Sequence, residues 1–191
     1  MFTSTSNADL AKTGAADALI PFIRAAATIG FAIAPCSLGF VIIAVSEQLI
    51  RSIMVGDDPE MLVSDLQNQF PNEAIEVMEN DNGGLVAKVV DLIERPGQAL
   101  DLPLDIGGTD FQTHVWDALP KVPAGTTASY TFLAEQIGAP NAVRAVERAC
   151  AANHLAVAIP CHRAVRANGD LAGYRWGIER KRALLEREAM K

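Results

Sequence analysis

A run of 22 residues without a charge, Ala25 to Ser46, constrains most what this chain can fold into. Its length would allow one crossing of a lipid bilayer. Pro35, Ser37 and Gly39 divide it into two apolar pieces of strand length, because proline and glycine interrupt a regular element. The N-terminus also lacks the basic start of a signal peptide. We therefore expect a flexible N-terminal segment followed by core strands, and no insertion into a membrane.

Short strands and helices are expected to follow one another along the chain. Asp58 can cap a helix whose first turn accepts Pro59. Leu62, Leu66 and Phe70 then recur at helical spacing. Apolar and β-branched patterns, breakers and caps predict strands at residues 27–34, 40–46 and 49–55, an extended stretch at 100–106, and further helices at 85–94, 110–119 and 178–190.

Charge is distributed unevenly along the 191 residues, whose net charge is −7. Residues 1–107 carry 5 Lys/Arg and 15 Asp/Glu, whereas residues 108–191 carry 11 and 8. The second part is therefore basic, and it could meet nucleic-acid phosphates or simply form a solvated basic helix. Three cysteines without a CxxC pair favour a reduced cytoplasm over a disulfide framework, and no cluster has zinc-site spacing.

Two short helices joined by a tight turn are expected in this basic part. Ser129 can cap a helix that ends at Ile137, and Gly138-Ala139-Pro140 forms a turn before a helix over residues 141–152. Helix, short turn, helix is the pattern of helix-turn-helix DNA-binding proteins. It also occurs in many α-helical domains that bind no DNA, so the pattern alone does not decide.

The helix expected over residues 141–152 is amphipathic. Val143, Val146 and Cys150 follow i, i+3, i+7 spacing and are expected to face inward. Arg144 and Arg148 then lie on the outer face, where they could meet a partner.

A cysteine follows an apolar run, residues 155–159, that is expected to be a strand. Pro160 stiffens the turn in which Cys161 and His162 stand side by side. A free cysteine is only about 3% thiolate at neutral pH, so nucleophilic use needs a base. Neighbours on an extended chain point apart, so a bridging water or a bend at Pro160 would be needed to couple them. The alternative is a buried, inert thiol.

The last expected helix supplies a carboxylate that could orient this histidine. Its apolar face is expected to contain Ile178, Leu185 and Ala189, and Glu188 lies near that face. Glu186 is expected to point elsewhere. A nucleophile, a base and an orienting acid form the usual catalytic relay.

The motif Ile159-Pro160-Cys161-His162-Arg163 resembles that of the O6-alkylguanine-DNA alkyltransferase family, the methylated-DNA–protein-cysteine methyltransferases. Arg144-Ala145-Val146 and Asn153 before the motif, and Gly173-Tyr174 after it, extend the resemblance. It covers about residues 28–190 and is similar to the C-terminal half of the bacterial adaptive-response, Ada-type, members. Residues 148–153 and 173–177 are typical of that branch.

The resemblance implies a chemical role for each matching residue. Cys161 would accept the alkyl group, His162 would be its water-mediated base, and Glu188 would orient the histidine. Asn153 would organise the turn before the cysteine. Tyr130 would donate a hydrogen bond to the extruded guanine. The activity implied is irreversible, single-turnover transfer of a methyl or larger alkyl group from O6-alkylguanine, and less surely O4-alkylthymine, after base flipping.

The resemblance also implies how DNA and the base are held. Arg144 would enter the duplex from the minor groove and fill the vacated place. The further contacts implied are Ser129, Thr131 and Arg148 for DNA, and Ala164, Gly173, Tyr174 and Arg175 for the substrate pocket. Two departures from the family pattern stand out: Ala164 replaces a larger aliphatic residue, and His154 follows Asn153 where proline is common.

The fold implied is α+β. Residues 1–25 would be a flexible segment, residues 26–107 a small RNase-H-like α/β subdomain, and residues 108–191 a helical subdomain with the helix-turn-helix and the active cysteine. The partner would be double-stranded DNA carrying O6-alkylguanine, bound by a cytoplasmic monomer without metal or organic cofactor. The alternatives are a lesion-binding or regulatory helix-turn-helix protein without chemistry, and a thiol hydrolase.

Overall fold

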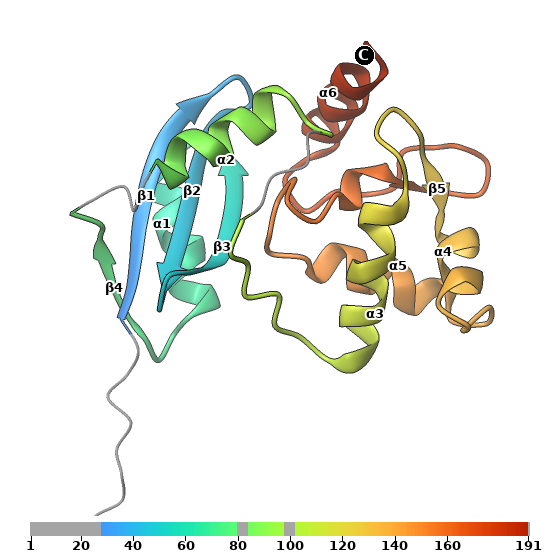
Figure 1. Cartoon of the computed structure of the whole chain (residues 1–191), viewed down its shortest axis with the longest axis horizontal. Helices are drawn as coiled ribbons and strands as arrows, with labels where there is room; N and C mark the ends of the chain where they lie inside the picture. Colours follow the sequence, from blue (N-terminus) through green and yellow to red (C-terminus); the bar gives the residue numbers. More distant parts are fainter. Residues whose placement is uncertain (1–27, 80–83, 98–101, 191) are drawn as a thin grey trace, which may run out of the picture.

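The computed structural model describes residues 28–79, 84–97 and 102–190 of the chain. In these ranges a four-stranded sheet with two helices is followed by a mainly helical half (Figure 1). The elements of the first half are β1 (Thr28–Cys36), β2 (Gly39–Ser46), β3 (Leu49–Gly56), α1 (Pro59–Gln69), β4 (Ala74–Val77) and α2 (Leu85–Glu94). Those of the second half are α3 (Asp110–Ala118), η1 (Leu119–Lys121), β5 (Ala128–Ser129), α4 (Tyr130–Gln136), α5 (Val143–Ala152), η2 (Cys161–Arg163), β6 (Ala164–Val165) and α6 (Ile178–Ala189).

The sheet has the strand order β3-β2-β1-β4. The first three strands form an antiparallel meander, and β4 adds to β1 in parallel. Residues 41–45 of the central strand β2 are all buried, which requires both faces of the sheet to be covered. Helices α1 and α2 cover them from opposite sides (Figure 1). The described part of the uncharged run, residues 28–46, therefore forms β1 and β2, and β2 supplies most of its buried residues.

Most elements expected from the sequence are confirmed within a few residues. The Asp58 carboxylate caps α1 by accepting from the backbone N–H groups of Glu60 and Met61, with Pro59 in the first turn. Helix α2 has the expected bounds, and α3 ends one residue early because Leu119 begins the 3₁₀ helix η1. Strand β4 is not among the expected elements: its four residues carry little β pattern, and pairing with β1 defines it.

The expected strand at residues 155–159 is wrong. Leu155 alone makes a bridge, to Ile53 of β3, and the chain then turns. The N–H of Ile159 returns to the carbonyl of Leu155 at 3.0 Å, and Val157 has a positive φ of 64°. An apolar run of this length does not distinguish a strand from a buried turn. Cys161 consequently starts the 3₁₀ helix η2 and does not stand at a strand end.

The two halves share one apolar core. The buried cluster runs from the sheet through α3, α4 and α5 to α6. Single bridges join Ile50 to Leu104 and Ile53 to Leu155, so the edge of β3 is partly covered by the second half. None of the helices in the described ranges is both long and apolar enough to span a bilayer. The expected flexible segment 1–25 and residues 100–101 of the expected extended stretch lie outside the described residues.

Candidate active site around Cys161

The thiol of Cys161 lies inside the protein, with only 3% of the residue exposed. Asn153, the residue that caps the C-terminus of α5, donates from Nδ2 to Sγ of Cys161 at 3.2 Å and to the carbonyl of Ile159 at 3.0 Å. Its Oδ1 accepts from the backbone N–H of Leu155 at 2.8 Å. One buried amide therefore replaces the missing strand hydrogen bonds and orients the turn that carries the thiol.

His162 and Glu188 form a buried pair that joins η2 to α6. Nε2 of His162 lies 2.9 Å from Oε1 of Glu188. Nδ1 of His162 is buried and has no hydrogen-bond partner in the described protein. Burial lowers the pKa of His162 and the glutamate only partly opposes this, so the imidazole is held neutral. A neutral ring that donates to Glu188 keeps Nδ1 as a proton acceptor.

Arg163 completes the carboxylate's surroundings. Its Nε and Nη2 donate to Glu188 at 3.1 and 2.9 Å, and its Nη1 donates to the carbonyl of Val122 at 2.7 Å. The backbone N–H of Gly125 reaches Oε2 of Glu188 at 3.2 Å. Burial opposes ionisation, but hydrogen bonds from His162 and Arg163 bring the pKa of Glu188 down to about 2. The carboxylate is therefore ionised at every physiological pH.

The resting thiol is neutral. Burial raises the pKa of Cys161 to about 11, although the Asn153 hydrogen bond and the Lys181 ammonium oppose this. Lys181 is itself fully buried, and Nζ donates to the carbonyls of Ala164 at 2.6 Å and Ala172 at 3.3 Å. A neutral thiol becomes a good nucleophile only when its proton is removed. The acceptor atom Nδ1 of His162 is a group that could receive this proton.

Two tyrosines lie close enough to Cys161 for a thiolate there to influence their ionisation. Tyr130 lies at the start of α4 and is buried. Burial is the main cause of its raised pKa, and the nearby side chains of Cys150, Glu147 and Cys161 raise it further. Burial and Cys161 likewise raise the pKa of Tyr174, whose ring stacks edge-on against Trp176 at 5.1 Å between centroids. Both hydroxyls therefore keep their protons and can act as donors.

The residues predicted to contact DNA lie on the surface. Arg144 and Arg148 are exposed on α5, and Thr131 is exposed on α4. Val146 and Cys150 are buried as expected, whereas Val143 is only partly covered. The Ser129 hydroxyl accepts from the backbone N–H of Phe132 at 3.0 Å, so it caps α4. The structure thus separates this exposed set from the buried group around Cys161.

The remaining predicted pocket residues surround the loop before α6. Ala164 is fully buried in β6, directly after η2, and pairs with Ala128 of β5. Gly173 and Arg175 are exposed on the loop that carries Tyr174. A Cβ added at Gly173 would meet no atom within 4 Å, so open space adjoins the loop at this residue.

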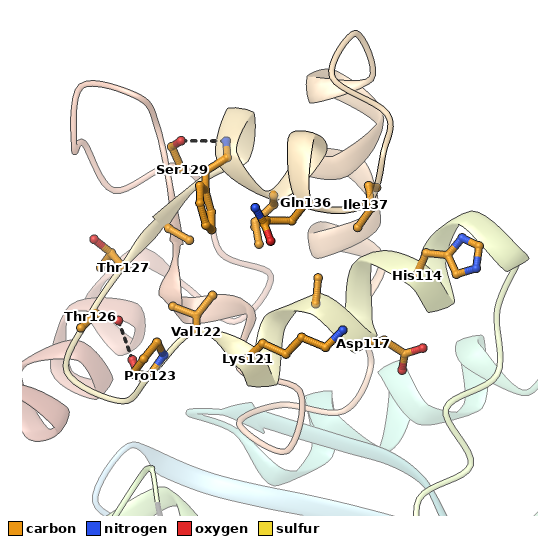
Figure 2. A pocket seen from close by; sticks show the side chains of 14 residues that line it. His114, Asp117, Lys121, Val122, Pro123, Thr126, Thr127, Ser129, Gln136 and Ile137 are labelled. Carbon is orange, nitrogen blue, oxygen red and sulfur yellow. Dashed lines mark hydrogen bonds between the residues drawn. The ribbon is translucent and has the colours of Figure 1, made fainter.

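A surface groove of about 730 Å³ opens between α3 and α4 (Figure 2). Ser129 is among its lining residues, whereas Cys161, His162 and Glu188 are not. The lining comprises His114, Asp117, Ala118, Lys121, Val122, Pro123, Thr126, Thr127, Ala128, Ser129, Phe132, Leu133, Gln136 and Ile137. The buried thiol and its hydrogen-bonded partners are therefore not part of this groove.

The buried face of α6 differs from the expected one. Ala189 is exposed, and Ile178 and Leu185 are only partly covered. The buried residues are Lys181, Leu184 and Glu188, at i, i+3 and i+7. Two of them are charged, which an apolar-periodicity criterion overlooks. The sequence therefore places Glu188 correctly near the buried face, although the residues expected to share that face were wrong. It does not predict that Lys181 is buried or that Arg163 donates to Glu188.

The fold and the site together define a class of protein: a mixed helix-and-sheet protein in which a buried cysteine is followed by a buried histidine that is hydrogen-bonded to an ionised glutamate. The described residues contain no group of three or more His, Cys, Asp or Glu side chains that could hold a metal ion. Residues 110–190 match the family described as 6-O-methylguanine DNA methyltransferase, DNA binding domain.

Known proteins extend this match to most of the chain. The chain is 49% identical over 162 residues to the Bifunctional transcriptional activator/DNA repair enzyme Ada of Escherichia coli, covering 83% of this chain and 45% of the relative. It is 36% identical over 122 residues to the inducible Methylated-DNA--protein-cysteine methyltransferase of Bacillus subtilis, covering 64% of this chain and 68% of that protein. The chain spans about half the length of the first curated relatives it matches.

Solved structures agree. The crystal structure of Mycobacterium tuberculosis OGT in complex with DNA superposes with a TM-score of 0.67 at 33% identity, covering 85% of this chain and 93% of that one. The chain belongs to the O6-alkylguanine-DNA alkyltransferase (methylated-DNA–protein-cysteine methyltransferase) family.

Proposed function

We propose that this protein repairs DNA by transferring the alkyl group of O6-alkylguanine irreversibly to Cys161. The observation that carries the proposal is the grouping of one thiol with an orienting amide and a buried relay. Asn153 holds Sγ at 3.2 Å, and His162 is fixed 2.9 Å from the ionised Glu188. Relatives and solved structures carry the names of this activity or of its complex with DNA.

The proposed chemistry begins with deprotonation. The thiol proton of Cys161 passes to Nδ1 of His162, directly or through a water, and Glu188 stabilises the imidazolium that forms. The thiolate attacks the alkyl carbon, so a carbon–sulfur bond forms as the carbon–O6 bond breaks. The electron pair stays on the guanine, and the Tyr130 hydroxyl stabilises this negative charge by donating a hydrogen bond. The guanine then takes up a proton equivalent to the one that His162 received, so the histidine returns to its neutral form. The thioether is stable, so each molecule acts once.

The alkyl carbon of a duplex lesion cannot reach a buried thiol unless the base leaves the stack. We propose that α4 and α5 act as a helix-turn-helix on the minor groove and that Arg144 fills the vacated position. Extrusion costs a few kcal/mol, which the inserted side chain and the pocket contacts offset. Ser129, Thr131 and Arg148 would hold the backbone, and Ala164, Gly173, Tyr174 and Arg175 would enclose the base.

The finer organisation follows the same proposal. Residues 26–107 form an RNase-H-like subdomain, and residues 108–191 form the DNA-binding alkyltransferase subdomain. The protein acts in the cytoplasm as a monomer, on double-stranded DNA and without a cofactor. O6-methylguanine is the principal substrate, and O4-alkylthymine is a secondary candidate.

The proposal is tested by stoichiometry. A duplex with one O6-methylguanine is titrated with protein, and guanine recovery is measured by digestion and chromatography. We expect recovery to stop at one guanine per protein molecule, and to vanish in Cys161→Ala. Catalytic turnover, or unchanged recovery in Cys161→Ala, would refute it.

A further inference from the structure

The loop that carries Tyr174 is held by an arginine of α6. Arg180 lies in the first turn of α6, where a positive charge is opposed by the helix dipole. Other contacts must therefore offset this unfavourable position of the charge. Its Nη1 donates to the carbonyl of Trp176 at 2.8 Å. The side chain is only 17% exposed.

The same guanidinium also reaches two separate turns of the sheet half. Its Nε donates to the carbonyl of Leu38, between β1 and β2, at 2.8 Å. Its Nη2 pairs with Oδ1 of Asp57, at the end of β3, at 2.5 Å. A planar guanidinium suits this use because its donors point in fixed, divergent directions. One side chain thus joins residues 173–177, here called the Tyr174 loop, to the β-sheet.

The loop borders a hollow on its other side, although the Trp176 side chain is buried in the core. A cavity of about 420 Å³ lies between the Tyr174 loop and the ends of β3 and α1. Its lining includes Met54, Met61, Arg175 and Trp176 as well as Arg180 itself. Without the arginine, the loop could therefore shift into space that no side chain fills.

We propose that Arg180 is a positioning residue for the alkyl-transfer reaction: by tying the Tyr174 loop to the β-sheet, it sets the shape of the substrate pocket. This inference rests on the proposed function, because the Tyr174 loop is assigned there to the base pocket. The hydrogen bonds of Arg180 go to Leu38, Trp176 and Asp57, and none goes to the thiol or to the His162–Glu188 pair. Arg180 therefore governs binding of the base and its alkyl group rather than the chemical step.

The test compares Arg180→Met with Arg182→Met under single-turnover conditions. Methionine keeps much of the apolar stem, and Arg182 is an exposed neighbour that pairs with Glu179 on its own helix. Transfer from an O6-methylguanine duplex gives a half-saturating concentration and a limiting rate. We expect Arg180→Met to raise the half-saturating concentration about tenfold, because charge-assisted hydrogen bonds are lost. The limiting rate should stay within about twofold, and Arg182→Met should match the unmodified protein.

Two further measurements separate positioning from general damage. Asp57→Ala removes one of the three contacts and should also raise the half-saturating concentration, but by less. An unchanged half-saturating concentration in Arg180→Met, or a loss confined to the limiting rate, would overturn the proposal.

Hydrogen–deuterium exchange of the amides at residues 173–177 gives a readout that needs no activity. These amides should exchange faster in Arg180→Met than in the unmodified protein, and equal exchange would overturn the inference. If the unmodified protein transferred no alkyl group, the proposed function would fail, whereas exchange would still decide whether Arg180 holds the loop.

Discussion

Nε2 of His162 lies 2.9 Å from Oε1 of Glu188, and both side chains are shielded from solvent. The two residues are 26 positions apart in sequence, so the last helix must be docked before the relay exists. Arg163 binds the same carboxylate and keeps it ionised, which leaves the histidine's Nδ1 as the group that can take a proton. The helix α6 therefore contributes a carboxylate to the buried site that holds His162, although it follows the cysteine turn at a distance in sequence.

Glu188→Gln should slow alkyl transfer to Cys161 by about 100-fold at neutral pH, because an amide no longer stabilises an imidazolium. The measurement is the single-turnover rate with an O6-methylguanine duplex. Glu186→Gln is the matched control, since Glu186 is exposed on the same helix. Equal rates for the two variants would show that the glutamate does not assist the histidine.

Glu188 should also govern stability in acid. Its pKa is lowered to about 2 in the folded protein, so its contribution is complete above its ordinary pKa and is lost as pH falls toward about 2. At pH 7, Glu188→Gln should destabilise the protein by about 3 kcal/mol, because buried Arg163 loses its counter-charge. Thermal unfolding followed between pH 7 and 3 should show this difference shrinking with acidification. A constant difference would contradict the assignment.

Much of this architecture could be read from the sequence. The sheet strands, the Asp58 cap, the bounds of α2 and the helix pair follow from apolar spacing, proline and capping residues. These are local signals that tertiary packing here reinforces. The pairing of Glu188 with His162 is predicted through the family resemblance, and the distance between them shows that they meet.

The remainder depends on contacts that no local pattern encodes. Residues 155–159 are apolar because they are buried in a turn, and Asn153 supplies the hydrogen bonds that a strand would have supplied. Strand β4 exists only through its partner. Lys181 lies on the buried face of α6 because two backbone carbonyls receive its ammonium, and both belong to segments outside the helix. The sequence signal for this contact is the charge itself: Lys181 stands at a core position of the amphipathic helix α6, where an apolar residue is usual.

Lys181→Met should make Cys161 less reactive. The buried ammonium opposes the effect of burial on the thiol's pKa, so its removal should raise that pKa further and reduce the thiolate fraction. Below the pKa, the alkylation rate falls in proportion to the thiolate fraction. The rate of alkylation by iodoacetamide at pH 8 measures this, with exposed Lys88→Met as control. An unchanged rate would show that Lys181 does not influence the reactivity of the thiol and serves only the structure.

Arg144→Ala should impair repair of duplex DNA far more than reaction with free O6-benzylguanine. The Arg144 side chain is exposed on α5, away from the buried group around Cys161. A free base is not stacked in a duplex, so its reaction does not require an inserted side chain. Rates with both substrates are compared in the same preparation. Equal losses would show that Arg144 does not replace the extruded base.

The most direct measurement is the tandem mass spectrum of the tryptic peptide 149–163 after incubation with an O6-methylguanine duplex. This peptide contains both Cys150 and Cys161, and its fragment ions assign an added mass to one of them. Transfer to the thiol predicts a gain of one methyl in place of one hydrogen on that peptide, with Cys36 and Cys150 unmodified. It also predicts no gain on any peptide of Cys161→Ala. An unmodified Cys161 peptide, or a methyl group on another residue, would contradict the central claim.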